Sequence, residues 1–490
     1  MLRTPSFETV RTTGKFLADS GYDVPGLADG LDLTDSLYAN LENLAPLLEK
    51  TAGDSILPVL ARLFFVGWPV DEQLCGRVIP ERILAGAFES GLLRRSDSKI
   101  EAVAILLPFR GLLVACDAPR LRGENRELII GPSPSTHLIA RLAAGGAGET
   151  TLDLGTGSGV LALEAARYSD SVTGIDINPR FQAFAEFNAA LNGIDGVRFV
   201  CGDAFQPVNE RHFSRIIANP PFFLGPAKEY TYSDSPLELD GFTRYLAEQA
   251  HAYLEEGGYF QMICEWVELE GQPWEKRLRQ WAASSGCDVL VMVGPRLSPI
   301  NYAEKRSQEA KRLHGGSAMD LFSKRIAYFE ERGVRGILGG VISMRKRRGA
   351  NWFSSVGLNP TGDSLGETVR ERFRSLDFLA MHGEDELLAA KYRLAADAGL
   401  DQRQALTPEG WQIVSSELSR KGCFQDRLGL DGVVAGFLPL FDGKRTVFEI
   451  AGFVAESLPC SLEEARQRCL QLLRRLLQSG FVQPMNERAG

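Results

Sequence analysis

A glycine-rich turn between an expected strand and an expected helix carries the most chemical information in this sequence. Leu152 and Leu154 are apolar strand positions, and Gly155, Gly157 and Gly159 follow at every second position. Glycine lets a backbone turn sharply and approach a ligand closely. The helix that follows directs its first N–H groups and the positive end of its dipole at such a ligand. The spacing is G-x-G-x-G, which differs from the G-x-G-x-x-G of dinucleotide sites.

Acidic residues stand at the ends of the next two expected strands. Asp176 ends the second strand and is followed by Ile177, and Asp203 ends the third and is followed by Ala204. A carboxylate at the end of a strand accepts hydrogen bonds from both hydroxyls of a ribose, which makes Asp176 a candidate for that role. Asp203 is a candidate to accept a hydrogen bond from an adenine amino group. The alternatives are a helix cap at Asp176 and an ordinary turn at Asp203.

A fourth expected strand, residues 215–218, runs into Asn219-Pro220-Pro221-Phe222, with Phe223 next. In this order the four features resemble the class I S-adenosylmethionine-dependent methyltransferases. The turn D-L-G-T-G-S-G resembles the cofactor loop of that family, and N-P-P-F resembles the signature of enzymes that methylate planar amino groups. These are small-domain methyltransferases, similar to rRNA base N-methyltransferases and release-factor glutamine methyltransferases. The resemblance covers the middle part of the chain.

The resemblance implies a set of binding and catalytic residues. Asp153 would lie near the charged amino and sulfonium groups of the cofactor, with a capping role as its alternative. The catalytic loop would be Asn219, Pro220, Pro221 and Phe222. The residues expected at S-adenosylmethionine are Asp153, Gly155, Thr156, Gly157, Gly159, Asp176, Ile177, Asp203, Ala204 and Asn219.

The side chain of Asn219 suits a difficult methyl acceptor. The lone pair of an amino nitrogen conjugated to a ring or carbonyl is delocalised, which makes that nitrogen a poor nucleophile. The Asn219 side-chain oxygen and the Pro220 carbonyl can each accept one N–H of the target and so localise the pair. Two prolines stiffen the loop and remove competing donors, and Phe222 and Phe223 can stack on a flat target. The alternative is a proline-rich loop with aromatics buried for packing.

The composition is that of an ordinary soluble protein. The chain has 490 residues, a net charge of −9 and a hydrophobic fraction of 44%. The length suggests about three domains. Eight scattered cysteines and five separated histidines predict neither a zinc site nor a disulfide framework. Because no apolar run reaches membrane length and the first residues lack the core of a signal peptide, we expect a cytoplasmic enzyme without metal or membrane. The oligomeric state is left open.

The pattern along the chain indicates an α/β fold: a Rossmann-like class I methyltransferase sheet flanked by mainly helical, winged-helix-like domains. Residues 1–126 show three helices and then a hairpin over 102–108 and 111–116, typical of a winged helix, although a plain packing domain fits as well. Residues 127–350 alternate strands and helices, with last strands at 287–293 and 337–344 and two helices between them. Residues 351–490 predict an α+β domain with a winged-helix-like end, where Ser461 and Glu464 form a capping box.

The substrate is the open question. The densest basic run, Arg345, Lys346, Arg347 and Arg348, combines phosphate-binding charge with nearby aromatics, although a solvated strand end is its alternative. With the two flanking domains, the run favours an exocyclic base nitrogen in rRNA or tRNA as the acceptor. A second hypothesis is an N5-glutamine methyltransferase acting on a protein such as a release factor. A third is a non-catalytic cofactor-binding scaffold, which the intact N-P-P-F disfavours.

Overall fold

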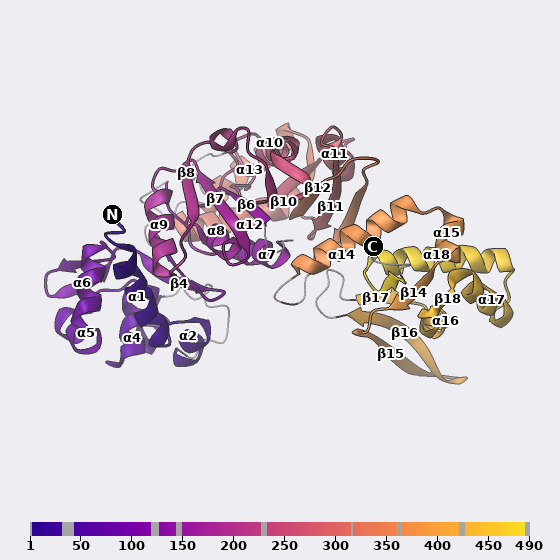
Figure 1. The fold of residues 1–490 in the computed structure, drawn as a ribbon, viewed down its shortest axis with the longest axis horizontal. Helices are drawn as coiled ribbons and strands as arrows, with labels where there is room; N and C mark the ends of the chain where they lie inside the picture. Colours follow the sequence, from indigo (N-terminus) through magenta and orange to yellow (C-terminus); the bar gives the residue numbers. More distant parts are fainter. Residues whose placement is uncertain are drawn as a thin grey trace. The chain divides into compact units, whose positions relative to one another are not determined.

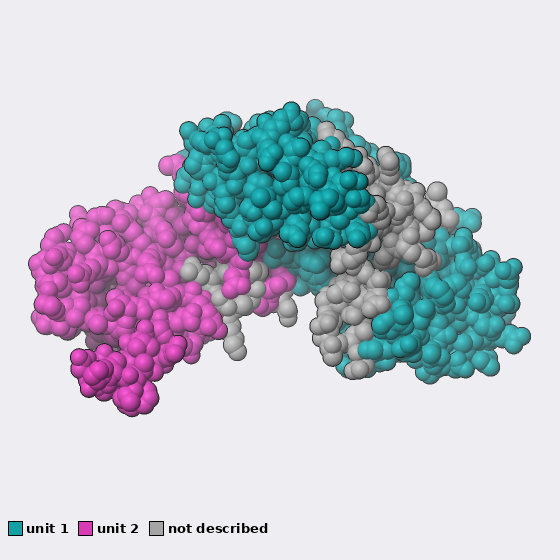
Figure 2. All heavy atoms as spheres, turned by 180° about the vertical axis from the view of Figure 1, so that it is seen from behind, with its two compact units in different colours: residues 1–140, 146–287, 295–349 teal, residues 141–145, 288–294, 350–490 magenta. Residues whose placement is uncertain are grey.

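The computed structural model describes residues 2–31, 44–118, 127–143, 149–226, 233–314, 317–359, 362, 365–420 and 427–485. The chain divides into two compact units (Figures 1 and 2). Unit 1 holds residues 1–140, 146–287 and 295–349, and unit 2 holds residues 141–145, 288–294 and 350–490. The predicted boundary at residue 126 lies outside the described residues, and the three-domain division stays a prediction.

The centre of unit 1 is a mixed sheet whose neighbouring strands follow the order β12-β10-β9-β6-β7-β8 (Figure 1). Strands β6 to β10 are all parallel to one another, and β12 is antiparallel to β10. This confirms the predicted Rossmann-like α/β sheet. The strands are β6 Glu149–Leu154, β7 Ser169–Asp176, β8 Val197–Cys201, β9 Phe213–Ala218, β10 Leu254–Leu269 and β12 Val334–Lys346.

Helices connect these strands because the parallel neighbours need crossover connections. The polypeptide between β11 and β12 forms two helices, α12 and α13, as the sequence predicts. The connecting helices are α7 Pro134–Leu142, α8 Val160–Ala165, α9 Phe181–Leu191, η4 Gln206–Val208, α10 Gly241–Gln249, η5 Ala250–Tyr253, α11 Trp274–Ala282, α12 Pro299–His314 and α13 Ala318–Glu331.

The N-terminal part of unit 1 differs from the expected three helices and one hairpin. It has two small sheets, because an earlier hairpin, β2–β3, pairs with β1, whereas the expected hairpin, β4–β5, pairs only with itself. The winged-helix interpretation stays a prediction. The elements are α1 Phe7–Asp19, α2 Val24–Gly30, α3 Leu44–Lys50, α4 Ile56–Leu60, η2 Ala61–Phe65, β1 Val70–Asp71, α5 Glu72–Val78, α6 Glu81–Glu89, β2 Leu93–Ser96, β3 Lys99–Ala102, β4 Ile105–Phe109 and β5 Leu112–Cys116.

Helix α9 joins this N-terminal part to the sheet. Asn188 bonds the N–H and C=O of Ala115 at 2.7 and 3.0 Å, and Asn192 bonds those of Leu113 at 2.8 and 2.7 Å. The two asparagines thus satisfy main-chain groups on one edge of β5 as a neighbouring strand would. Apolar residues of α9 also belong to the N-terminal hydrophobic core. The N-terminal part therefore packs on the helix that follows Asp176.

Unit 2 contains β11 from its second residue on, and β11 pairs in parallel with β13. The predicted capping box is present, because Ser461 caps α18 and pairs with Glu464. The winged-helix-like interpretation of this end stays a prediction. The elements are β11 Cys287–Val293, β13 Phe353–Gly357, α14 Gly366–Met381, α15 Glu384–Ala389, β14 Lys391–Leu394, β15 Ala398–Thr407, β16 Gly410–Arg420, β17 Arg427–Leu430, α16 Gly432–Phe437, η6 Leu438–Leu440, β18 Asp442–Thr446, α17 Val447–Ser457, α18 Leu462–Gln478 and β19 Val482–Pro484.

None of the helices within the described residues combines the length and the apolar character needed to cross a membrane.

Candidate functional site

The glycine turn adopts a backbone that only glycine enters readily. Gly155, Gly157 and Gly159 have φ angles of 72°, 52° and 81°, in the left-handed region where a side chain is disfavoured. The N–H groups of Gly155 and Thr156 both donate to the carbonyl of Ile175 at 2.9 Å, which fixes the turn against β7. A Cβ at Gly157 would meet no atom within 4 Å. The turn is therefore rigid and open on the side of Gly157.

Asp153, in the strand before the turn, is buried with one unused oxygen. Its Oδ2 atom accepts hydrogen bonds from the Thr156 hydroxyl at 2.6 Å and from the N–H of Ala162 at 3.0 Å. Its Oδ1 atom has no hydrogen-bond partner among the described residues. Burial raises the pKa of this carboxyl to about 7. The two hydrogen bonds lower the pKa, but burial is the larger effect. A buried acceptor without a donor is costly, and a bound ammonium group would satisfy it.

Asp176 lies at the end of β7, as predicted, and its side chain stabilises the glycine turn through hydrogen bonds. Its two oxygens accept the N–H groups of Gly157 at 2.8 Å and of Asn178 at 2.9 Å. Burial raises its pKa, although these backbone hydrogen bonds oppose the shift. A carboxylate has about four acceptor positions, so each oxygen can still accept one ribose hydroxyl. Ile177, the next residue, is 62% exposed and presents an apolar surface beside the carboxylate.

The end of β8 brings Asp203 to the same edge of the sheet. The N–H of Gly202 donates to the Asp176 carbonyl at 2.9 Å, and Ala204 has a positive φ of 45°. Asp203 is exposed. Burial and then the charge of Asp203 raise the pKa of Tyr245, on α10, so this phenol lies within electrostatic reach of Asp203. Sequence reasoning does not identify Tyr245, because α10 follows the third strand by a long stretch.

Asn219 follows β9, and β9 pairs with β6, the strand before the glycine turn. A Cβ at Gly155 would lie 4.0 Å from the Cα of Pro220, so the N-P-P-F loop and the turn are neighbours. The Asn219 Nδ2 atom donates to the Thr136 hydroxyl at 3.2 Å. This bond leaves Oδ1, the acceptor, without a donor among the described residues. The structure thus brings together the two halves of the site that the sequence predicts.

Thr136 is a contact that sequence reasoning missed. It lies on α7 and is 5% exposed. Its hydroxyl accepts the N–H of Ser133 at 3.2 Å, which fixes the oxygen that faces Asn219. A threonine in a Pro/Ser-rich segment resembles an ordinary cap, so the only signal is that the segment precedes the first strand of the core.

The two phenylalanines after the prolines occupy different surroundings. Their rings meet edge to face, with centroids 5.3 Å apart. Arg306 of α12 places its guanidinium carbon 3.5 Å from the centroid of the Phe223 ring. The Phe223 main chain also forms a bridge, donating to the Ser233 carbonyl at 2.8 Å and accepting from the N–H of Ser235 at 3.0 Å. Phe223 is held by protein contacts, whereas Phe222 is half-buried beside it.

The basic run lies at the other edge of the sheet from the glycine turn. Arg345 pairs with Tyr259, and Tyr259 pairs with Arg215 in the first half of β9. The Arg345 side chain is buried, and Lys346 donates to the carbonyl of Leu254 at 2.9 Å. Arg347 is half-buried, and the side chain of Arg348 is 94% exposed. The four residues are therefore not equally available to a nucleic acid.

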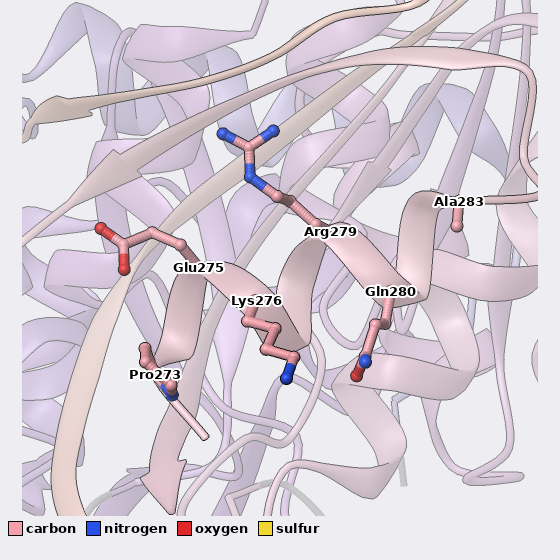
Figure 3. A pocket seen from close by; sticks show the side chains of 6 residues that line it. All are labelled: Pro273, Glu275, Lys276, Arg279, Gln280 and Ala283. Carbon is pink, nitrogen blue, oxygen red and sulfur yellow. The ribbon is translucent and has the colours of Figure 1, made fainter. Parts of the chain in front are cut away.

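An open hollow of about 510 Å³ runs along α11 and is lined by Pro273, Glu275, Lys276, Arg279, Gln280 and Ala283 (Figure 3). All six residues come from this one helix and the residues flanking it. None of them belongs to the predicted site, and Arg279 has other contacts. This hollow is separate from the glycine turn.

Comparisons with known proteins agree with this geometry. The model of the methyltransferase small domain matches residues 133–269. A release factor glutamine methyltransferase of Thermodesulfovibrio yellowstonii is 30% identical over 205 residues, which are 38% of this chain and 71% of the relative. A ribosomal protein L11 methyltransferase of Thiobacillus denitrificans is 34% identical over 226 residues, 39% of this chain and 75% of the relative.

A third relative, the ribosomal RNA small subunit methyltransferase C of Alcanivorax borkumensis, is 30% identical over 113 residues, 23% of this chain and 31% of the relative. The matched residues 133–269 include Thr136, the glycine turn, both strand-end acids and the N-P-P-F loop. The chain therefore belongs to the small-domain methyltransferases, and it is an enzyme whose cofactor is S-adenosylmethionine.

Proposed function

We propose that this enzyme transfers a methyl group to a planar amino group, with Asn219, Pro220, Pro221 and Phe222 as its catalytic loop. The observation that carries the proposal is the hydrogen bond from Asn219 Nδ2 to the Thr136 hydroxyl. It holds the amide through its nitrogen, which leaves the side-chain oxygen available as an acceptor for the target. A preorganised acceptor stabilises charge that develops in the transition state without further reorganisation.

The proposed cofactor site is the edge of the sheet formed by the ends of β6, β7 and β8. S-adenosylmethionine supplies an electrophilic methyl group on a sulfonium. Its amino group would donate to the unused Asp153 Oδ1 atom, and its ribose hydroxyls would donate to Asp176. The open side of Gly157 leaves room for a close backbone approach. The residues proposed to hold it are Asp153, Gly155, Thr156, Gly157, Gly159, Asp176, Ile177, Asp203, Ala204 and Asn219.

The target nitrogen would be oriented by two acceptors. The Asn219 Oδ1 atom and the Pro220 carbonyl would each accept one of its N–H groups. The nitrogen lone pair then points at the methyl carbon, the N–C bond forms as the C–S bond breaks, and one N–H proton leaves to solvent. Phe222 would stack on the flat face of the target. Phe223 supports Phe222 edge to face, because its own ring is already packed against Arg306.

We propose an exocyclic base nitrogen of ribosomal or transfer RNA as the acceptor. Phenylalanine at position 222 supports this choice, because release-factor enzymes of this group are expected to carry N-P-P-Y. One relative is an rRNA methyltransferase by name. Of the basic run, Arg347 and Arg348 remain candidates for phosphate contacts. Arg345 and Lys346 are left out, because the first is buried and the second is bonded to a carbonyl.

A glutamine side-chain amide of a protein is the second candidate acceptor. The specific observation that favours it is the 30% identity to a release factor glutamine methyltransferase over 71% of that protein. The same catalytic geometry serves both acceptors, because an amide nitrogen and an exocyclic base amine are both planar and conjugated.

Incubation with radiolabelled S-adenosylmethionine separates the two candidates. The enzyme would be mixed with total RNA from a methylation-deficient host, or with purified release factor, and Asn219→Ala would serve as the blank. Label in RNA that is removed by ribonuclease supports the leading proposal, and label in the release factor moves the assignment to glutamine. Equal labelling by the parent and by Asn219→Ala contradicts the catalytic proposal for either acceptor.

A further inference from the structure

The helical pair α12–α13 reaches back to the segment that follows the N-P-P-F loop. Tyr302, on α12, is 1% exposed. Its hydroxyl accepts the N–H of Leu224 at 2.9 Å and donates to the Glu265 Oε2 atom of β10 at 2.5 Å. Burial raises the pKa of Tyr302, and the charge of Glu265 adds to the shift, so the hydroxyl stays protonated. One tyrosine thus links the residue after Phe223 to the central sheet.

A second tyrosine does the same at the far end of the segment. The Tyr328 hydroxyl, on α13, accepts the N–H of Leu239 at 3.0 Å. Leu224, Tyr302 and Tyr328 belong to one hydrophobic cluster with Phe329. The main-chain N–H groups of Leu224 and Leu239 are therefore each held by a tyrosine hydroxyl of α12 or α13. A main-chain N–H in such buried surroundings needs an acceptor, and these two hydroxyls provide it.

Arg306, on α12, makes a third contact, with Phe223, the residue that follows the proposed catalytic loop. Its Nη2 atom donates to the Glu265 Oε1 atom at 2.5 Å and its guanidinium covers the ring of Phe223. Burial alone would lower the pKa of Arg306, but the adjacent Glu265 carboxylate raises it above the ordinary value. The arginine therefore carries a positive charge that is paired with Glu265, and its flat guanidinium lies over the ring of Phe223. A lysine has no flat cationic group and cannot reproduce this contact.

We propose that Tyr302, Tyr328 and Arg306 are positioning residues. Through them α12–α13 fixes Phe223, Leu224 and Leu239 and thereby orients Asn219 and Phe222 toward the target. This rests on the proposed role of Asn219. The contacts of the helical pair lie on the methyl acceptor side of the site, at Phe223, Leu224 and Leu239, so its variants should leave cofactor binding unchanged.

The test compares Tyr302→Phe and Tyr328→Phe with Tyr22→Phe. The control removes an equally buried hydroxyl of unit 1 that bonds the Leu106 carbonyl at 2.8 Å. For each variant we would measure the melting temperature, the dissociation constant of S-adenosylhomocysteine, hydrogen exchange of residues 220–240, and kcat and KM. The acceptor would be whichever of total RNA and purified release factor takes up label.

We expect Tyr328→Phe, which loses one hydrogen bond, to lower kcat about 2- to 12-fold, and Tyr302→Phe, which loses two, to lower it at least as much. Cofactor affinity should stay within about twofold of the parent. Exchange in residues 220–240 should be faster. Tyr22→Phe should keep kcat even when its melting temperature falls as far. Arg306→Lys should also lower kcat, because the charge remains but the planar contact with Phe223 is lost.

Parental kcat in both tyrosine variants, at an acceptor concentration well above KM, overturns the inference while the role of Asn219 stands. A kcat loss in Tyr22→Phe equal to that of the test variants also overturns it, since the effect is then one of general stability. Parental activity of Asn219→Ala, or no label in either acceptor, overturns the proposed function itself and the inference with it.

Discussion

The two halves of the site are held in place in different ways. At the cofactor edge, Asp153 contacts Thr156 and Ala162, and Asp176 contacts Gly157, so the supporting partners lie within 19 positions of one another in the sequence. At the N-P-P-F loop, Asn219 contacts Thr136 across 83 positions. The comparison shows that the proposed cofactor edge is supported by residues close in sequence, whereas the proposed catalytic loop is supported by a distant segment.

The contacts of α12 and α13 with the residues after the N-P-P-F loop are also long-range in sequence. Leu224 and Tyr302 are 78 positions apart, and Leu239 and Tyr328 are 89 positions apart. The glycine turn is supported by residues close to it in sequence, whereas the loop is supported by the distant helices α12 and α13. We therefore expect substitutions at the cofactor edge to affect binding and substitutions around the loop to affect turnover.

The largest effect should come from Asn219→Ala. The variant removes the acceptor proposed to orient the target nitrogen, and one missing preorganised polar partner lowers turnover by about 10²- to 10³-fold. Cofactor affinity should stay unchanged, as measured by calorimetry with S-adenosylhomocysteine. Asn209→Ala, an exposed asparagine of unit 1, is the control. If Asn219→Ala lowered cofactor affinity as much as turnover, the loop and the cofactor edge would not have the separate roles proposed for them.

Asp176→Ala should weaken the cofactor edge. Loss of charge-assisted hydrogen bonds to the ribose should cost about 1.5–3 kcal/mol, or about 10- to 150-fold in the dissociation constant. Turnover at saturating cofactor should change little by comparison. The matched control is Asp170→Ala, which removes an exposed carboxylate from the start of the same strand. An unchanged dissociation constant in the Asp176 variant would mean that the ribose lies elsewhere.

Asp153 should make cofactor binding depend on pH. Its pKa is about 7 in the free protein because burial disfavours the charged carboxylate. An ammonium group at Oδ1 favours the carboxylate, so binding should release a proton and the affinity should rise about tenfold from about pH 6 to about pH 8. Titrations in buffers of different ionisation enthalpy would detect that proton. In Asp153→Asn both the rise and the proton release should disappear, and their persistence would assign them to another group.

Thr136→Val should give the smallest effect, and it tests directly the contact between Thr136 and Asn219 across 83 positions. The substitution keeps the shape of the side chain but removes the hydroxyl that accepts from Asn219, so kcat should fall about 2- to 12-fold, the range for one hydrogen bond. Thr136→Ser, which retains the hydroxyl, should restore most of the loss. Steady-state kinetics on the labelled acceptor would show both. If valine and serine behave alike, the hydroxyl does not orient Asn219.

The strands of the methyltransferase sheet could be predicted because their signals are local. Leu152 and Leu154 alternate with polar positions in β6, the acid Asp176 ends β7 as expected, and the parallel order follows from alternating strands and helices. The N-terminal hairpins were harder to predict. The expected hairpin over 102–116 forms as β4–β5. The earlier hairpin β2–β3 and its pairing with β1 were not expected.

The basic run shows where local reasoning fails in the site. Four consecutive cationic residues suggest one shared surface, but Arg345 is buried in β12 whereas the side chain of Arg348 is 94% exposed. β12 ends at Lys346, so Arg347 and Arg348 lie beyond the strand. The antiparallel direction of β12 places the run at the end of the sheet away from Asn219. Neither fact can be read from the charges alone.

The sequence by itself determined that a glycine turn, two strand-end acids and N-P-P-F follow one another, and so determined the family and the cofactor. These features are local, because a turn type needs its glycines and a strand end needs its polar residue wherever the chain folds. Only the tertiary structure brought Thr136 to Asn219, and Tyr302, Tyr328 and Arg306 to the segment behind it. Such contacts depend on the pairing of distant strands and on the packing of α12 and α13, and no spacing in the sequence encodes them.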